Sequence, residues 1–147
     1  MRSEHLDDVL AIERLSFPTP WSRYAFESEL KNNRYSCYIV CLLSGRVIGY
    51  AGSWIIEDEA HITTLAVDPR YRGQGLGKAL LSEITSRCQA RGAERITLEV
   101  RPSNKIAQRL YENMGFIRVG IRRGYYTDTR EDAIIMWRNL NFSPTSR

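Results

Sequence analysis

The sequence has few residues of the kinds that build disulfide frameworks and metal sites. Its three cysteines, Cys37, Cys41 and Cys88, lie inside apolar patterns without a Cys-x-x-Cys pair, and the 147 residues include two histidines. Without paired or clustered ligands, a disulfide framework and a structural zinc site are both disfavoured. We expect reduced, buried thiols and no metal.

Long hydrophobic runs and clustered charges are also missing. No apolar stretch approaches the length of a membrane span, and the first residues, 1–5, lack the apolar centre of a signal peptide. The net charge of +4 is scattered, without a run of Lys or Arg. It is a weak indication of acidic partners or of transient contact with nucleic acid. We expect a cytoplasmic protein that binds no membrane and no specific nucleic acid.

What is present is the composition of a soluble globular protein, with 43% hydrophobic and 26% charged residues. A chain of this length can build one core. We therefore expect one domain over residues 1–147, with a disordered tail after about residue 142.

Helical and strand periodicities alternate along the chain, which predicts an α/β fold. Ser22 is expected to cap the second helix, and Gly92 stands where the third should end. The expected helices cover 6–15, 23–31, 76–91 and 104–114; the expected strands cover 38–43, 47–56, 60–67, 96–100, 116–122 and 133–140.

The last helix is expected to have two distinct faces, with Ser103 as its cap. Spacing of three and four residues places Ile106, Leu110 and Met114 on a stripe expected to face the sheet. The second face is formed by Asn104, Ala107 and Tyr111.

A glycine-rich loop links the expected strand 60–67 to the helix that follows. Glycines allow close approach of backbone N–H groups to an anion, and the helix N-terminus adds unpaired amides and a positive dipole end. The spacing does not fit a P-loop or a dinucleotide fingerprint. An ordinary strand-to-helix turn is the alternative. The segment reads Arg72, Gly73, Gln74, Gly75, Leu76, Gly77 and Lys78, after the turn Asp68-Pro69.

Three residues near the strand 96–100 fit the roles of an acyl transfer to an amine. Glu99 lies on the polar face of the strand and is a candidate proton acceptor, and Tyr111 is a candidate proton donor. Asn104 is a candidate ligand for the acyl carrier. Each has a structural alternative: a solvated ion pair, a boundary tyrosine and a helix cap. His61 is expected to be packed or surface-exposed rather than catalytic.

The sequence resembles the RimI family, ribosomal-protein-alanine N-acetyltransferases of the GNAT superfamily. The pattern Arg-x-x-Gly-x-Gly after a Val-Asp-Pro strand end is similar to the acyl-CoA loop of that superfamily. Further segments, spread over most of the chain, narrow the resemblance to the RimI family. They are Phe17 to Ser22, Glu59 to Ile62, Leu65 to Pro69, Leu98 to Asn104, Leu110 to Phe116 and Arg122 to Tyr126.

The resemblance implies a GNAT fold, a mixed and mostly antiparallel sheet flanked by helices, with acyl-CoA bound between the splayed central strands. It implies acetyl transfer from acetyl-CoA to the N-terminal alanine of a small-subunit ribosomal protein, with Glu99 as proton acceptor and Tyr111 as proton donor. Backbone N–H groups near Val67 are candidates for polarising the thioester. The implied acetyl-CoA ligands are Leu65, Ala66, Val67, Arg72, Gly73, Gln74, Gly75, Leu76, Gly77, Lys78 and Asn104.

Several alternatives remain open at this point. The acceptor is expected to enter opposite the CoA side, between a loop around Tyr125 and Tyr126 and the helix near Trp21 to Phe26. A polyamine, an aminoglycoside or a lysine side chain is an alternative acceptor, and a non-catalytic acyl-CoA-binding module is a more remote one. We expect a monomer or weak dimer. Members of the family usually begin with a short strand, which is absent or very short in this sequence.

Overall fold

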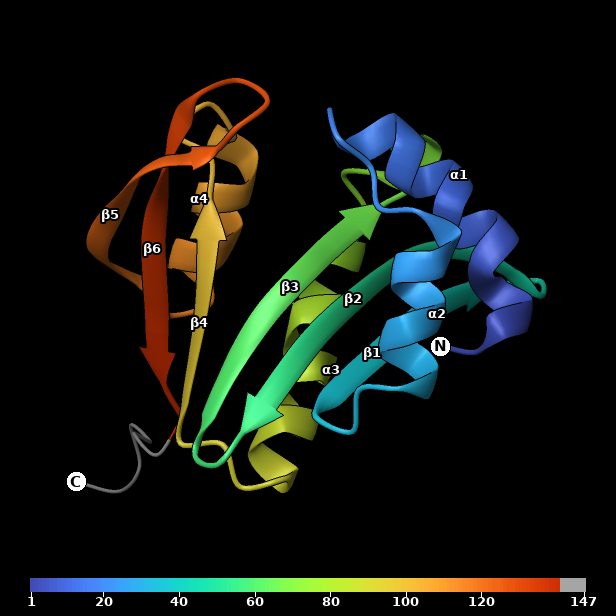
Figure 1. The fold of residues 1–147 in the computed structure, drawn as a ribbon, viewed down its shortest axis with the longest axis horizontal. Helices are drawn as coiled ribbons and strands as arrows, with labels where there is room; N and C mark the ends of the chain where they lie inside the picture. The colour runs from blue at the N-terminus through green and yellow to red at the C-terminus, as the bar shows by residue number, and fades with distance from the viewer. Residues whose placement is uncertain (141–147) are drawn as a thin grey trace.

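The structure is a computed structural model that describes residues 1–140 as a six-stranded sheet covered by helices on both faces (Figure 1). The strand order is β1-β2-β3-β4-β6-β5, and β3–β4 is the parallel pair in this otherwise antiparallel sheet. The fold class predicted from the sequence is therefore confirmed, while the expected disordered tail lies outside the described residues. The strands are β1 (Ser36–Leu43), β2 (Arg46–Ile56), β3 (Glu59–Val67), β4 (Arg95–Val100), β5 (Ile117–Tyr126) and β6 (Glu131–Asn139).

Two helices lie on each face of the sheet (Figure 1). On one face, α1 (Leu6–Ser16) and α2 (Arg23–Lys31) pack on β1 and β2 through a core that includes Phe26 and Tyr50. On the other, α3 (Leu76–Ala90) and α4 (Lys105–Asn113) cover a larger core that includes Leu81, Ile84 and Leu98. The burial of these apolar faces is the main stabilising term of the fold. Two short 3₁₀ helices, Ser3–His5 and Pro69–Tyr71, complete the elements.

The two central strands pair over a short length and then separate. Residues Glu59, Ala60 and His61 of β3 pair with Arg95, Ile96 and Thr97 of β4, although β3 continues to Val67 and β4 to Val100. Figure 1 shows the two strands diverging toward their carboxyl ends. The inner edges of both strands are thus unpaired beyond this point, as the resemblance implied.

The boundaries of the first three helices agree with the sequence analysis within about a residue, and their caps are as expected. The Ser22 hydroxyl accepts a hydrogen bond from the Ala25 N–H, which begins α2, and Gly92 follows α3 with a φ of 98°. No strand precedes α1 among residues 1–140.

The last helix, α4, corrects two expectations. Its N-cap is Asn104, whose side-chain oxygen accepts from the Ala107 N–H; Ser103 instead donates to Glu131. The expected sheet-facing stripe is also wrong, because Ile106 is 82% exposed. Leu110 and Met114 are half-buried against the core, and the fully buried residues of the helix are Gln108 and Tyr111.

The chain after α4 differs from the expectation as well. The strand predicted to end at residue 122 continues to Tyr126, so Tyr125 and Tyr126 end β5 rather than lie in a loop. The connection to β6 is the short turn 127–130. Two register shifts in the β5–β6 pairing accommodate this extension.

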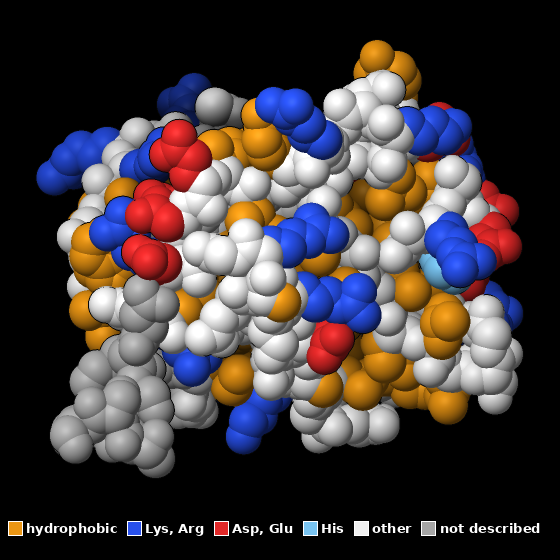
Figure 2. Space-filling view, turned by 90° about the horizontal axis from the view of Figure 1, so that it is seen from below, with side chains coloured by type: hydrophobic (Ala, Val, Ile, Leu, Met, Phe, Trp, Pro, Cys, Tyr) orange, Lys and Arg blue, Asp and Glu red, His pale blue; other side chains and the backbone are white. Residues whose placement is uncertain are grey.

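At the end of the molecule where β3 and β4 are paired, residues 1–140 show no concentration of one charge on the surface. In Figure 2, which views that end, Lys and Arg side chains are spread over the face and interspersed with Asp and Glu. Within residues 1–140, no helix has the length and apolar character needed to span a membrane.

A buried carboxylate joins α1 to the connection that follows it. Glu13 of α1 is 3% exposed; its Oε2 accepts from the Trp21 N–H at 2.9 Å, and its Oε1 accepts from the Tyr50 hydroxyl. Burial raises the pKa of Glu13 above its usual 4.5, against the effect of these two hydrogen bonds. Glu13 thus fixes the start of α2 relative to the sheet.

We predict that Glu13→Gln and Glu13→Leu together distinguish two contributions of Glu13 to the free energy of unfolding, that of its hydrogen bonds and that of its charge. Glu13→Leu leaves the Trp21 N–H and the Tyr50 hydroxyl without an acceptor and should lower the free energy of unfolding by about 2–4 kcal/mol. Glu13→Gln keeps an acceptor and removes the buried charge. Urea unfolding from pH 4 to 8 measures both effects.

The sign of the pH dependence follows from the raised pKa of Glu13. Between about pH 4.5 and the folded-state pKa, the native protein binds more protons at this site than the unfolded chain, so this site's contribution to stability falls as pH rises. The stability of Glu13→Gln relative to the wild type should therefore increase through that window and then level off. A difference that is independent of pH would contradict this assignment.

Candidate active site

A histidine and a glutamate meet where the central strands separate. His61 is the last residue of β3 that pairs with β4, and Glu99 lies two residues beyond its partner Thr97, on the same face of the sheet. His61 Nε2 lies 2.6 Å from Glu99 Oε2. The Glu99 side chain is 9% exposed and that of His61 is 30% exposed. Glu99 is therefore a shielded carboxylate at the base of the splay, the point where β3 and β4 separate, and its partner His61 is half-exposed.

Aromatic side chains surround this pair. The ring of Trp54 on β2 lies against His61 with 6.2 Å between centroids. Burial, followed by the charge of Glu99, raises the pKa of Tyr125. Burial also raises the pKa of Tyr126, and the neighbouring Tyr125, Glu99 and Tyr111 act in the same direction. Glu99 and Tyr111, separate in sequence, thus both influence the pKa of Tyr126.

Tyr111 is buried in α4 and packs against Phe116 with ring centroids 5.8 Å apart. Burial raises the pKa of Tyr111 to about 12. The hydroxyl therefore remains protonated at neutral pH, as a proton donor must.

The glycine-rich loop has the backbone conformation that an anion site needs. Gly73 and Gly75 have φ values of 79° and 81°, and a Cβ built on either would meet no atom within 4 Å. Gly75 is the N-cap of α3, and no side chain among residues 1–140 caps this helix. Open space thus faces uncapped amides at the start of a 15-residue helix. These residues fit the pyrophosphate of acetyl-CoA.

Two arginines hold the strand end that leads into this loop. The carboxylate of Asp68, which is 5% exposed, accepts from the backbone and side chain of Arg70. The Nε of Arg72 donates to the Val67 carbonyl at 3.1 Å, and its Nη2 donates to the Ser16 hydroxyl at 3.3 Å. Arg72, expected as a phosphate ligand, therefore positions the end of β3 in this structure.

The remaining cofactor candidates lie at the end of β3 and at the start of α3. Leu65 and Val67 pack against the α3–α4 core, Ala66 is buried in the other core, and Gln74 and Lys78 are exposed. A Cβ on Gly77 would lie 3.4 Å from Leu110, so the start of α3 lies close to α4. Leu76 is half-buried.

Asn104 caps α4 through its side-chain oxygen, which accepts from the Ala107 N–H at 3.1 Å. This contact confirms the structural alternative for Asn104 and does not use its side-chain nitrogen. The Nδ2 group has no hydrogen bond to another described residue, and Asn104 is exposed. The amide can therefore cap the helix and donate to a ligand at the same time.

The expected acceptor-side aromatics have different environments. Phe26 is fully buried among Trp21, Tyr38 and Tyr50, which excludes direct contact with an acceptor in this structure. Trp21 is half-buried and Tyr125 is 42% exposed. Trp21 and Tyr125 thus remain candidates for contact with an acceptor.

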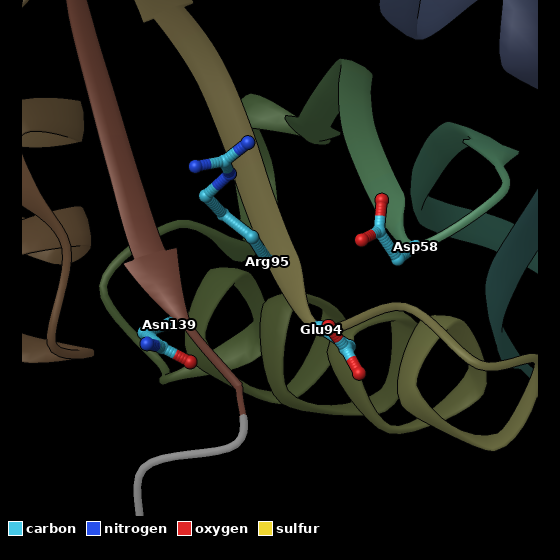
Figure 3. A pocket seen from close by; sticks show the side chains of 4 residues that line it. All are labelled: Asp58, Glu94, Arg95 and Asn139. Atoms are coloured by element: carbon cyan, nitrogen blue, oxygen red, sulfur yellow. The ribbon is translucent and has the colours of Figure 1, made fainter.

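A separate hollow lies at the amino end of β4 (Figure 3). It has a volume of about 200 Å³ and is lined by Asp58, Glu94, Arg95 and Asn139. The Asp58 carbonyl there accepts from the Glu94 N–H, and Arg95 pairs with Glu59. Residues 1–140 contain no group of three or more His, Cys, Asp or Glu side chains placed to hold a metal ion.

The sequence analysis did not anticipate the contact between His61 and Glu99. His61 was expected to be packed or surface-exposed, and its side chain is 30% exposed and packs against Trp54. The structure in addition places its Nε2 on Glu99. The alternation of β3 puts His61 on the polar face, but the pairing register of β3 with β4 was needed to align it with Glu99.

The chain belongs to the Acetyltransferase (GNAT) family, whose model matches residues 6–116. As a member of this family, it is an acetyltransferase that takes its acyl group from acetyl-CoA.

Individual proteins and solved structures are similar to this chain over most of its length. A Bacillus subtilis (strain 168) protein, provisionally named as a ribosomal protein bS18-alanine N-acetyltransferase, is 46% identical over 141 residues, covering 96% of this chain and 93% of that protein. The crystal structure of the Escherichia coli ribosomal-protein-S18-alanine N-acetyltransferase has a TM-score of 0.87 and 36% identity, covering 100% of this chain and 95% of the other. The crystal structure of a NatC complex bound to Gag peptide and CoA includes a chain with a TM-score of 0.81 and 26% identity, covering 95% of this chain and 92% of the other.

We predict that Gly75→Ala weakens acetyl-CoA binding about tenfold, whereas Gly45→Ala does not. Both glycines have a φ of 81° with no atom within 4 Å of a built Cβ, so both substitutions should destabilise the fold by a similar amount, about 1 kcal/mol. Gly45 lies in the β1–β2 turn, whereas a methyl group on Gly75 would enter the space before the α3 amides.

Isothermal titration calorimetry with acetyl-CoA and thermal unfolding measure the two effects separately. Equal acetyl-CoA affinities for the two variants would place the pyrophosphate somewhere other than this loop.

Proposed function

We propose that this protein transfers the acetyl group of acetyl-CoA to a protein N-terminal α-amine, namely the N-terminal alanine of a small-subunit ribosomal protein. The observation that carries the proposal is the shielded Glu99 carboxylate, held by His61 at the base of the splay between a loop suited to pyrophosphate and the opposite, α1–α2 face. The names of the relatives at 46% and 36% identity support the choice of acceptor.

The amides of Gly73 to Lys78 would hold the pyrophosphate, with Lys78 adding positive charge and Gln74 and Leu76 extending the contact. The unpaired inner edge of β3 from Leu65 to Val67 offers backbone groups to the pantetheine, and the Asn104 amide adds a donor. Acetyl-CoA supplies the activated acetyl group. An N–H near Val67 would polarise its carbonyl.

Glu99 would accept the proton of the α-ammonium group, directly or through a water, which frees the nitrogen lone pair to attack the thioester carbon. As the new amide bond forms, the C–S bond breaks and the thiolate leaves. Tyr111 would donate its proton to that sulfur, consistent with a hydroxyl that stays protonated up to about pH 12. The nitrogen loses its second proton as it becomes the amide, and that proton would restore the Tyr111 hydroxyl through solvent. His61 would keep the Glu99 carboxylate aimed into the splay.

The chemistry of the acceptor favours an α-amine over a lysine. With a pKa of about 7.7–8.0, roughly a quarter or more of an α-amine is neutral at pH 7.5, whereas about 0.1% of a lysine is. Deprotonation of the lysine costs about 4 kcal/mol, and of the α-amine less than about 1 kcal/mol. One carboxylate is sufficient for the easier deprotonation.

We also propose a single domain over residues 1–147 that acts as a monomer or weak dimer. A ribosomal acceptor and acetyl-CoA would meet in the cytoplasm, where we place the reaction.

We predict that a peptide with a free N-terminal alanine is acetylated, while the same peptide with a blocked N-terminus and a lysine is not, and spermidine is not. Release of CoA thiol from acetyl-CoA measures all three acceptors in parallel. Turnover restricted to spermidine or to the blocked peptide would overturn the proposal while leaving the family assignment intact. Acetyl-CoA binding without turnover on any amine would indicate a non-catalytic module.

We predict that Glu99→Gln lowers kcat/KM most at low pH. At low pH nearly every acceptor arrives protonated and needs a base, whereas at high pH the neutral amine can react without one. Rates between pH 6 and 9.5 with the alanine peptide measure the profile. A Glu99→Gln profile parallel to that of the wild type would remove Glu99 from the base role.

His61→Gln and His61→Ala provide the controls for this assignment. Glutamine can still donate to Glu99 Oε2, whereas alanine leaves that oxygen without its partner. We expect His61→Gln to retain more activity than His61→Ala, as a positioning role requires.

A further inference from the structure

Arg101 organises the turn between β5 and β6. It follows the last residue of β4, and its Nη1 and Nη2 donate to the two carboxylate oxygens of Asp128 at 3.0 and 2.9 Å. Nη1 also donates to the Thr129 hydroxyl at 2.9 Å, and the guanidinium lies 4.0 Å from the centroid of the Tyr126 ring. Such a planar fork fixes a carboxylate in two directions.

Asp128 in turn contacts the other half of the molecule. Its Oδ2 accepts from the hydroxyl of Thr19 at 3.1 Å, across 109 residues of sequence. Thr19 lies in the connection between α1 and α2, on the far side of the splay from β4 and β6. Figure 1 shows this connection and the β5–β6 turn approaching each other above the diverging ends of β3 and β4.

Each partner of this contact is held independently of it. The α1–α2 connection is fixed by the Glu13 carboxylate at Trp21 and by Arg72 at Ser16. The β5–β6 turn is fixed by Arg101, whose hydrogen bond holds the pKa of Asp128 down at about 2, so that Asp128 is charged throughout the neutral range. The Thr19–Asp128 hydrogen bond therefore joins two ordered segments.

We propose that Thr19 and Asp128 form a clasp across the acceptor side of the splay, with Arg101 as the positioning residue, and that the closed clasp frames the site that receives the acceptor's N-terminal segment. The inference rests on the proposed function for its ligand, an extended peptide with a free α-amine. Glu99 and Arg101 are two residues apart in the chain, so one short segment carries both the proposed base and the support of the clasp.

Loss of the clasp should change the KM for the acceptor peptide and leave the KM for acetyl-CoA unchanged. The glycine loop and α4, which would hold acetyl-CoA, make no contact with Thr19 or Asp128 in the described hydrogen bonds. Loss of one hydrogen bond of this kind changes an equilibrium by about two- to tenfold. We therefore expect an effect of that size on the KM for the peptide.

The test compares Thr19→Val with Thr127→Val. Valine has the shape of threonine without its hydroxyl, and Thr127 is an exposed threonine of the same turn with no side-chain hydrogen bond to the described residues. We expect Thr19→Val to raise the KM for the alanine peptide about two- to tenfold, with kcat and the KM for acetyl-CoA unchanged. Thr127→Val should match the wild type. An unchanged peptide KM in Thr19→Val, or equal increases in both KM values, would overturn the proposal.

A second measurement keeps the clasp separate from the proposed function. Amide hydrogen exchange of residues 127–130 should be faster in Thr19→Val than in the wild type, and faster still in Arg101→Lys, which lacks the planar fork. If the wild-type protein does not acetylate the alanine peptide, the proposed function is refuted. The amide hydrogen exchange of residues 127–130 then still tests whether the clasp exists. Unchanged exchange in both variants would refute the clasp, whatever the acceptor proves to be.

Discussion

The short parallel pairing of β3 with β4 is the constraint on which the rest of this structure depends. Each central strand has a full antiparallel partner on its outer edge, β2 for β3 and β6 for β4, and these ladders hold the strands in place. The inner edges can therefore separate after His61 and Thr97 without loss of the sheet. Their freed backbone groups need partners, and the extended pantetheine of the proposed function would supply them.

The two faces of the sheet present different features around this splay. On the α3–α4 face, positive-φ glycines stand before a helix N-terminus without a side-chain cap, and this is the proposed site for the pyrophosphate. On the opposite face, the α1–α2 connection and the β5–β6 turn meet through Thr19 and Asp128. Glu99 projects from β4 to this second face, because its neighbours Leu98 and Val100 point into the α3–α4 core. Arg72 joins the end of β3 to the end of α1. In the proposed function, donor and acceptor would meet at the base of the splay.

Local patterns predicted the elements well but failed where tertiary contacts overrode them. Ser103 and Asn104 are both good caps, and the choice between them depends on Glu131, which takes the Ser103 hydroxyl. Ile106 fits the apolar stripe of α4, yet the helix turns Tyr111 and Gln108 inward. Gln108 is buried because its amide donates to the carbonyls of Arg101 and Pro102, and a hydrophobic pattern contains no sign of such partners.

The sequence by itself determined the alternation of helices and strands, the glycine-rich loop proposed for an anion and the candidates Glu99 and Tyr111, because these depend on local periodicity, glycine conformation and residue chemistry. Only the tertiary structure decided that His61 lies on Glu99, that Phe26 is buried and that Arg101 supports a contact between Thr19 and Asp128. The physical reason is that strand register and the packing of distant segments set these contacts. Residues 38 or 109 positions apart meet through the sheet, and no local pattern encodes that distance.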